Sequence, residues 1–258
     1  MLRTSQDPEG GYVIQSVDRA VRILFALQGA RRMTLSELAA ELGLPVTTVH
    51  GIVRTLVAHG VVVQEGGGGR YRLGPAVLRM GNVYLDTLDL RARSLTWAHD
   101  LAHRTGLAVR VGVLLGSDVV VIHHEPRPDG SRQMPETGIE IPSHASALGK
   151  SILAFMPSDS WPADLHSMTA ETITATPALA DHLIAVTATG LAFECDEAVL
   201  GESGIAGAVF DRTGVVGSVG VVVPTTDWPA DESVIEAVRT TARTISRELG
   251  SSRWPGLG

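Results

Sequence analysis

The segment that most constrains the fold lies between residues 34 and 73, where two short amphipathic helices are predicted in close succession. The first helix begins at Thr34, whose spacing from Glu37 is typical of a capping box, and it ends at Gly43. The second begins at Pro45, a residue that suits the first turn of a helix. Two amphipathic helices joined by a short turn containing glycine predict a helix-turn-helix. The predicted inward stripe of the second helix consists of Val49, Ile52, Val53, Leu56 and Val57.

Two short strands follow the helix pair and predict a wing. Residues 61–65 and 70–73 read as strands, and four glycines separate them. A helix-turn-helix followed by a β-hairpin is a winged helix, whose second helix lies in a DNA major groove. Arg70 and Arg72 are placed where a wing touches phosphate. The polar side of the second helix carries Thr47, Thr48, His50 and Arg54.

Composition indicates a globular protein with one large domain or two ordinary ones. The chain has 258 residues, of which 44% are hydrophobic and 19% charged. Residues 1–11 contain no apolar core of a signal peptide, and the longest uncharged stretch, 213–226, is short and rich in glycine. We therefore expect a cytoplasmic protein without membrane contact. The single cysteine, Cys195, excludes an internal disulfide and suits a reducing compartment.

Charge is distributed unevenly along the chain. The net charge is −7, but residues 1–75 carry +2 and the remainder carries −9. A weakly basic segment on an acidic body fits a DNA-reading head that makes few phosphate contacts. Useful affinity would then need a homodimer or a homotetramer.

Two further helices flank the winged helix in the sequence. Residues 14–28 form an amphipathic pattern with Val17, Val21, Leu24 and Leu27 on one predicted inward face. A helix over about 76–89 has an apolar stripe too wide for a free linker. It can bury that stripe on its own chain or against a partner subunit, and a helix between two domains favours the partner. The stripe consists of Val77, Leu78, Gly81, Tyr84, Leu85 and Leu88.

From residue 91 onward, strand pairs alternate with helices. Strand hairpins separated by helices, without regular βαβ alternation, predict an antiparallel sheet with flanking helices, an α+β arrangement. Residues 126–142 are rich in proline, glycine and charge and read as a loop or irregular strand. The predicted strands are 107–115, 119–124, 205–210 and 215–223, and the predicted helices are 91–105, 145–155, 178–189 and 233–249.

Four motifs in order resemble the IclR family of bacterial transcriptional regulators. They are the run 16–24 (SVDRAVRIL), the helix pair 34–50, the run 71–75 (YRLGP) and the run 142–150 (PSHASALGK). The resemblance implies a winged helix-turn-helix over 12–74, a linker and dimerisation helix over 75–90, and a GAF-like effector-binding domain over 91–250. It also implies a ligand-responsive repressor or activator that binds palindromic, double-stranded operator DNA as a dimer or tetramer.

The resemblance also implies DNA-contacting residues. Family members usually carry a basic residue directly after the histidine of the recognition helix, where this chain has Gly51. One contact is therefore missing, and glycine weakens the helix by up to about 1 kcal/mol relative to alanine. The implied DNA contacts are Thr34, Thr47, Thr48, His50, Arg54, Arg70 and Arg72.

The small-molecule site is implied by the start of the helix after Pro142 and by the acidic stretch 194–197, with contributions from the strands that follow. Free amides at a helix start suit a carboxylate. Members that bind small keto acids carry Cys and Ser on the strands where this chain has Gly204, Gly220 and Val222. We therefore expect a roomier, less polar pocket, for an aromatic or acyl-type metabolite. The implied effector contacts are His144, Ala147, Leu148, Glu194, Gly204, Gly220 and Val222.

Other chemistry is disfavoured by spacing. His123 and His124 would point to opposite faces of a strand and cannot share a metal ion. The run 149–151 (GKS) lacks the first glycine of a phosphate-binding loop, and Ser203 lacks the second glycine of a nucleophile elbow. We predict no enzyme activity, metal or cofactor. The alternative is a sensor or enzyme domain whose winged helix binds protein, which the polar recognition face argues against.

Overall fold

The computed structural model describes residues 13–66 and 69–255, and the chain divides into two compact units between Tyr84 and Leu85. Each unit is described by itself. Outside the described residues lie residues 1–12 and two of the four wing glycines. Residue 12 is the one at which the first domain was predicted to start. Among the described residues, no helix is both long enough and apolar enough to span a bilayer.

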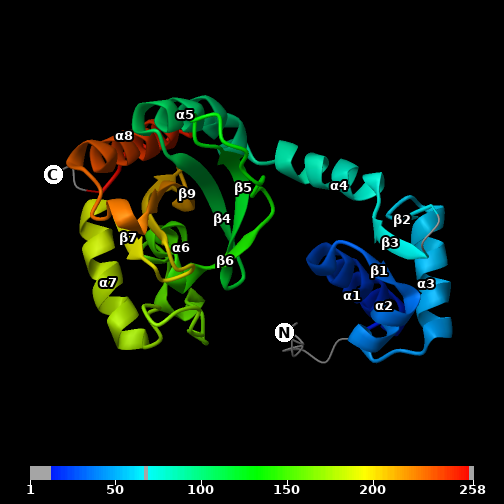
Figure 1. Ribbon diagram of the computed structural model, residues 1–258. Coiled ribbons are helices and arrows are strands. Elements are labelled where there is room, and N and C mark those ends of the chain that lie inside the picture. The colour runs from blue at the N-terminus through cyan, green and yellow to red at the C-terminus, as the bar shows by residue number, and fades with distance from the viewer. Residues whose placement is uncertain (1–12, 67–68, 256–258) are drawn as a thin grey trace. The chain divides into compact units, whose positions relative to one another are not determined.

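The first unit is a winged helix-turn-helix, as predicted (Figure 1). Helices α1 (Gln15–Ala30), α2 (Leu35–Leu42) and α3 (Val46–Ala58) pack on a small antiparallel sheet. The sheet has the order β1-β3-β2, formed by β1 (Met33–Thr34), β3 (Arg70–Leu73) and β2 (Val62–Gln64). Helix α4 (Pro75–Asp86) follows the wing.

The local signals that begin and end α2 are present as predicted. The Thr34 hydroxyl accepts a hydrogen bond from the Glu37 amide (3.2 Å), and the Glu37 carboxylate accepts one from the Thr34 amide (2.7 Å). Gly43 ends the helix with a φ of 64°, a conformation that glycine adopts without strain. These two signals fix where α2 begins and where it ends.

The predicted inward face of α1 was wrong at its first half. Val17 and Val21 are 56% and 42% exposed, whereas Ile23, Ala26 and Leu27 are buried. The second half of α1 is almost uniformly apolar, so periodicity alone did not select the face. The buried line is chosen instead by contact with α2, α3 and β3. The two-residue strand β1 was also not predicted.

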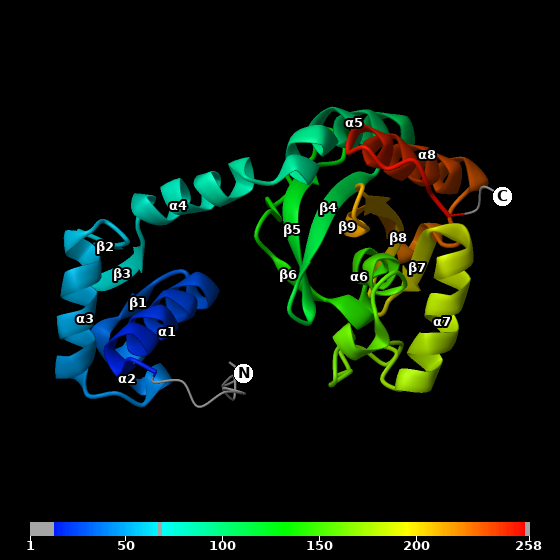
Figure 2. The same cartoon turned by 180° about the vertical axis from the view of Figure 1, so that it is seen from behind.

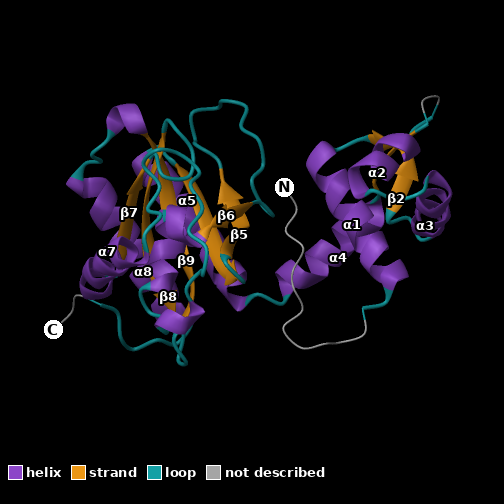
Figure 3. Cartoon of the chain, turned by 90° about the horizontal axis from the view of Figure 1, so that it is seen from below, coloured by secondary structure: helices purple, strands orange, loops and turns teal. Residues whose placement is uncertain are grey.

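The second unit is built on one six-stranded antiparallel sheet of order β6-β5-β4-β9-β8-β7. Helices α5 and α8 cover one face, and α6 lies on the other (Figure 1), with α7 beside β7 (Figure 2). Figure 3 shows this sheet from below, with β7 at one edge and β5 and β6 toward the other. The strands are β4 (Ala108–Leu115), β5 (Asp118–Glu125), β6 (Glu140–Pro142), β7 (Leu191–Cys195), β8 (Glu202–Phe210) and β9 (Val215–Pro224). The helices are α5 (Asp89–Thr105), α6 (Ala147–Leu153), α7 (Thr176–Thr189) and α8 (Glu232–Glu248). Three short 3₁₀ turns are η1 (Ser143–Ala145), η2 (Ser158–Ser160) and η3 (Thr225–Asp227).

Strand β7 was not predicted, although its residues had been singled out for their acidic side chains. It begins directly after Gly190, which ends α7 with a φ of 71°. It then pairs with β8, with Glu194 opposite Gly204. The strand therefore carries Glu194 onto the sheet beside the glycines of β8, where the effector site was expected.

The two faces of this sheet differ in character. Val109, Ile205 and Val221 belong to the apolar core shared with α5 and α8. Their neighbours along the strands, such as Arg110, Gly204 and Val222, face the side of α6, because successive side chains alternate across a strand. The α6 face thus combines small, apolar and charged residues, a composition suited to binding rather than to packing.

Candidate functional sites

The polar side of α3 is exposed. Thr47, His50 and Arg54 are solvent-exposed, Thr48 is half-buried, and Val49 and Val53 are buried on the opposite side. The first unit therefore leaves the predicted recognition face open. Whether each of these residues contacts DNA remains a prediction.

Thr34 occupies a different environment from the other predicted DNA contacts. Its hydroxyl and amide are both engaged with Glu37 in the capping box. We therefore assign Thr34 a helix-capping role. Any contact of Thr34 with DNA would have to be made while these two hydrogen bonds are kept.

The wing arginines face carboxylates. Arg70 Nη2 lies 3.5 Å from Glu37 Oε1, and Arg72 Nε lies 3.4 Å from Glu65 Oε1. Arg32 Nε lies 3.3 Å from the same Glu65 oxygen. Sequence analysis missed Arg32, because its place beside the wing depends on the pairing of β1 with β3. The wing therefore presents basic groups that already have acidic partners.

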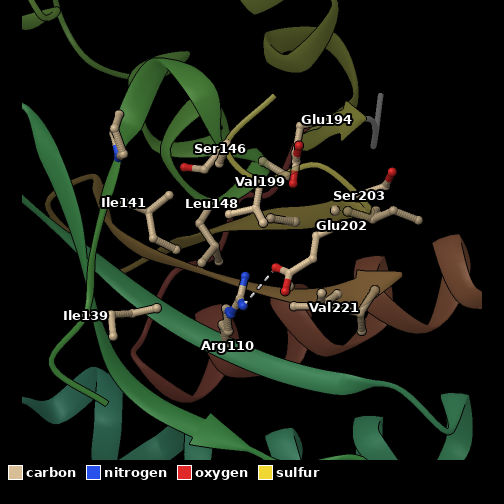
Figure 4. Close-up of a pocket in the computed structure, with 18 of the residues that line it drawn as sticks. Arg110, Ile139, Ile141, Ser146, Leu148, Glu194, Val199, Glu202, Ser203 and Val221 are labelled. Atoms are coloured by element: carbon tan, nitrogen blue, oxygen red, sulfur yellow. Dashed lines mark hydrogen bonds and ion pairs between the residues drawn. The ribbon is translucent and has the colours of Figure 1, made fainter. Parts of the chain in front are cut away.

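A cavity of about 180 Å³ lies between α6 and the strands β4, β8 and β9 (Figure 4). Its walls combine apolar residues, among them Ile141, Leu148 and Val199, with the charged groups of β4, β7 and β8. Six of the seven predicted effector contacts line it: Ala147, Leu148, Glu194, Gly204, Gly220 and Val222. Their assignment as effector contacts stays a prediction, but the fold brings them together.

His144, the seventh predicted contact, does not line this cavity. It sits in the 3₁₀ turn that precedes α6 and is 1% exposed. Its Nε2 lies 3.0 Å from the carbonyl oxygen of His166, and the two rings meet edge to face. His144 therefore anchors the loop around His166 and is not among the residues that line this cavity.

Arg110 is the cavity residue that sequence analysis missed. Its guanidinium makes two bonds to Glu136 (Nε–Oε2 2.6 Å and Nη2–Oε1 3.1 Å) and one to Glu202 (Nη2–Oε2 3.2 Å; Figure 4). Arg110, Glu202 and Val222 also line a second, outer cavity of about 320 Å³. The side chains of this ion pair therefore separate the two cavities. The only available signal was a lone arginine in an otherwise apolar strand.

Glu194 faces the inner cavity with a strongly perturbed carboxyl group. Burial raises its pKa to about 7, although a hydrogen bond from the Glu197 amide and the charge of Lys150 oppose this shift. At neutral pH the Glu194 carboxyl therefore exists both as donor and as acceptor of hydrogen bonds. Such a group suits a ligand hydroxyl, which can satisfy either form.

A buried ion pair stands behind the cavity wall. Lys150 on α6 is fully buried, and its Nζ lies 2.6 Å from Glu197 Oε1. Burial lowers the pKa of Lys150 and raises that of Glu197, while their mutual attraction acts in the opposite direction. Burial, with the charge of Lys150, also lowers the pKa of His182 on α7 to about 4. Lys150 thus ties α6 to the 196–201 loop, whose residues Ala198 and Val199 line one side of the cavity.

The wall of the cavity is mainly apolar, and the strand glycines contribute unequally to its space. A Cβ atom at Gly220 would lie 2.5 Å from the Ile205 carbonyl oxygen, so glycine is required by strand packing there. A Cβ atom at Gly204 would lie 3.0 Å from Glu194 Oε1 and 3.4 Å from the Ala147 Cβ. Of these two glycines, only Gly204 can add space for a ligand, and the wall includes four charged residues: Arg110, Glu140, Glu194 and Glu202.

The two adjacent histidines of β5 have separate partners. His123 Nε2 lies 3.5 Å from Glu125 Oε2, whereas His124 Nε2 lies 3.5 Å from Glu136 Oε2. Across residues 13–66 and 69–255, no cluster of three or more His, Cys, Asp or Glu side chains is arranged to hold a metal ion.

Comparison with known proteins covers both units. Residues 16–66 match the IclR helix-turn-helix domain, and residues 82–247 match the family described as bacterial transcriptional regulator IclR C-terminal. The chain is 42% identical to the glycerol operon regulatory protein of Streptomyces griseus, over 93% of this chain and 98% of that protein, and 41% identical to that of Streptomyces coelicolor, with the same coverage. The crystal structure of an IclR transcriptional regulator from Alicyclobacillus acidocaldarius has a TM-score of 0.81 and 28% identity, covering 93% of this chain and 100% of that one.

Proposed function

Since the chain belongs to the IclR family of bacterial transcriptional regulators, we propose that it represses a glycerol-utilisation operon and is released by a small ligand. The head would bind a palindromic operator as a homodimer or homotetramer in the cytoplasm, and the ligand would bind in the inner cavity. The observation that carries the proposal is the convergence of six expected residues on one cavity in a chain whose recognition face is open.

The charges of the cavity favour a neutral, hydroxylated ligand. Arg110 is the one basic residue in its wall, and two carboxylates already occupy its guanidinium. The α6 amide of Gly149 is taken by the Ser146 hydroxyl, at 3.1 Å. A carboxylate ligand would thus have to displace a bound carboxylate, whereas hydroxyls can hydrogen-bond to Glu194 and Glu202 directly. A cavity of about 150 Å³ holds a molecule the size of benzene, so about 180 Å³ suits a small polyol.

Helix α4 supports self-association of the chain. Leu78, Met80 and Val83 are each more than 60% exposed, and Tyr84 is 48% exposed. Large apolar side chains that share one exposed helix are typical of an interface between subunits. Light scattering would give the oligomeric state, and V83E would be expected to lower it. An unaltered chain that runs as a monomer would contradict this part of the proposal.

The proposal is tested by gel shift with the DNA upstream of the chain's own gene. We expect salt-sensitive binding that a small polyol such as glycerol weakens and that benzoate, standing for the carboxylate or aromatic effector expected from the sequence, does not. Response to benzoate alone would reverse the effector assignment. Absence of salt-sensitive DNA binding, with and without metabolite extract, would favour the alternative of a protein-binding winged helix.

A further inference from the structure

The base of the wing places two arginines side by side. Strand β1 pairs with β3 so that Met33 lies opposite Tyr71. In this antiparallel register the residue before Met33, Arg32, lies opposite Arg72. Like charges directly across a strand pair repel each other, so this arrangement needs an anion between the two guanidinium groups.

The carboxylate of Glu65 supplies that anion. Its Oε1 forms ion pairs with both arginines, at 3.3 Å from Arg32 Nε and 3.4 Å from Arg72 Nε. Glu65 is held in place by the hairpin, because its amide donates to the Arg70 carbonyl oxygen at 2.9 Å. A carboxylate oxygen between two arginines marks a position where a phosphate oxygen could form the same two ion pairs.

The ion pairs are open to exchange with a ligand from solution. The Arg32 and Arg72 side chains are 64% and 51% exposed, whereas the Glu65 side chain is 27% exposed. Tyr71, between the two arginines of β3, is buried in the head, so Arg70 and Arg72 share the outer face of the wing. Exposed ion pairs of this kind are weak and yield to a more highly charged partner.

We propose that Arg32 and Arg72 form a binding site for one DNA backbone phosphate, which Glu65 occupies until DNA displaces its carboxylate. Glu65 then restrains sequence-independent binding, since each non-specific contact must first release the two arginines. Arg32 becomes a DNA-contacting residue outside both the recognition helix and the hairpin. This inference rests on the proposed DNA-binding role of the head.

Binding of the full chain to a labelled random-sequence duplex, measured over a range of salt, tests the proposal. R32Q should reduce the slope of log affinity against log salt by about 1. E65Q should raise affinity by about two- to five-fold, the range of an exposed ion pair that no longer competes. E41Q is the matched control, because Glu41 is an exposed acid of the same unit, on α2, and loses the same charge.

A mutant cycle separates displacement of Glu65 from simple repulsion of DNA. In the R32Q/R72Q background, E65Q should no longer raise affinity, because the arginines that it frees are absent. A rise that persists there, or an equal rise in E41Q, would overturn the proposal, as would an unchanged salt slope in R32Q. Loss of salt-sensitive binding in the unaltered chain would instead overturn the proposed function, and this inference with it. Circular dichroism confirms that each variant is folded.

Discussion

The two units place their functional residues in opposite environments. In the head, the recognition face and the wing arginines are exposed, and their ion pairs stand in solvent. In the second unit, Arg110, Lys150 and Glu194 are withdrawn from solvent, and burial shifts the pKa values of Lys150 and Glu194. The difference indicates that the first unit, the head, has exposed ion pairs that can be replaced by contacts with DNA. The second unit instead keeps its strongest charge interactions buried in its interior.

The comparison is tested most strongly at Lys150. K150M would leave Glu197 buried without its cation, and we expect the free energy of unfolding to fall by about 3 to 5 kcal/mol. K150M/E197L should recover most of this loss. The matched head variant, R70Q, breaks the exposed pair with Glu37 and should cost less than about 1 kcal/mol. Urea denaturation measures all three; equal costs for K150M and R70Q would contradict the contrast between the units.

The next largest effect concerns the pH dependence set by Glu194. Its pKa is raised to about 7 in the folded chain, so the folded state holds this proton more tightly than the unfolded state. The protonated Glu194 carboxyl therefore contributes to the free energy of unfolding at low pH. This contribution is lost as pH rises through about 7. E194Q should remove this fall and be more stable than the unaltered chain by up to about 3 kcal/mol at about pH 8. Thermal unfolding across pH measures it, and parallel pH profiles for the two chains would refute it.

A smaller effect is expected from filling the cavity. In G204V, the added side chain would begin 3.0 Å from Glu194 Oε1 and extend into the space between α6 and β8. We expect the ligand concentration needed to release DNA to rise by at least about tenfold, equivalent to about 1.4 kcal/mol. DNA affinity without ligand serves as the control and should not change. Retained ligand response would place the effector elsewhere.

The smallest effect is predicted on α3. Gly51 is exposed, and a Cβ atom there would have no neighbour within 4 Å. G51A should stabilise the chain by up to about 1 kcal/mol, because glycine disfavours a helix interior. G51R should in addition steepen the salt dependence of DNA binding by about 1 unit of slope. Urea denaturation measures the change in stability, and a lower free energy of unfolding for G51A would contradict the prediction.

Sequence alone predicted the head better than the second unit, because the head's signals are local. Thr34, Glu37 and Gly43 mark helix ends within a few residues of one another, and the structure has those ends. The antiparallel sheet was also predicted from its hairpins. The failures are non-local: Arg32 gains its role only through strand pairing, and Arg110 only because β4 lies between β5 and β9.

Two errors show how local patterns mislead. The start of α6 suggested that His144 faces the ligand, but a 3₁₀ turn intervenes and directs it to His166. Glycines on the strands suggested a roomy pocket, but Gly220 is required by close strand packing. In both cases the residue type correctly indicated a feature of the backbone. Whether the residue faces the cavity, however, depends on the segment that packs next to it.

The wall between the inner and outer cavities has a consequence for ligand range. The residues that line both cavities are Arg110, Val222 and Glu202, whose side chain is 40% exposed. Rotation of Glu202 about its own bonds would join the two spaces without moving a strand. For the effector site proposed in the inner cavity, the upper size of an acceptable ligand would then be set by the rotamer of one side chain, Glu202.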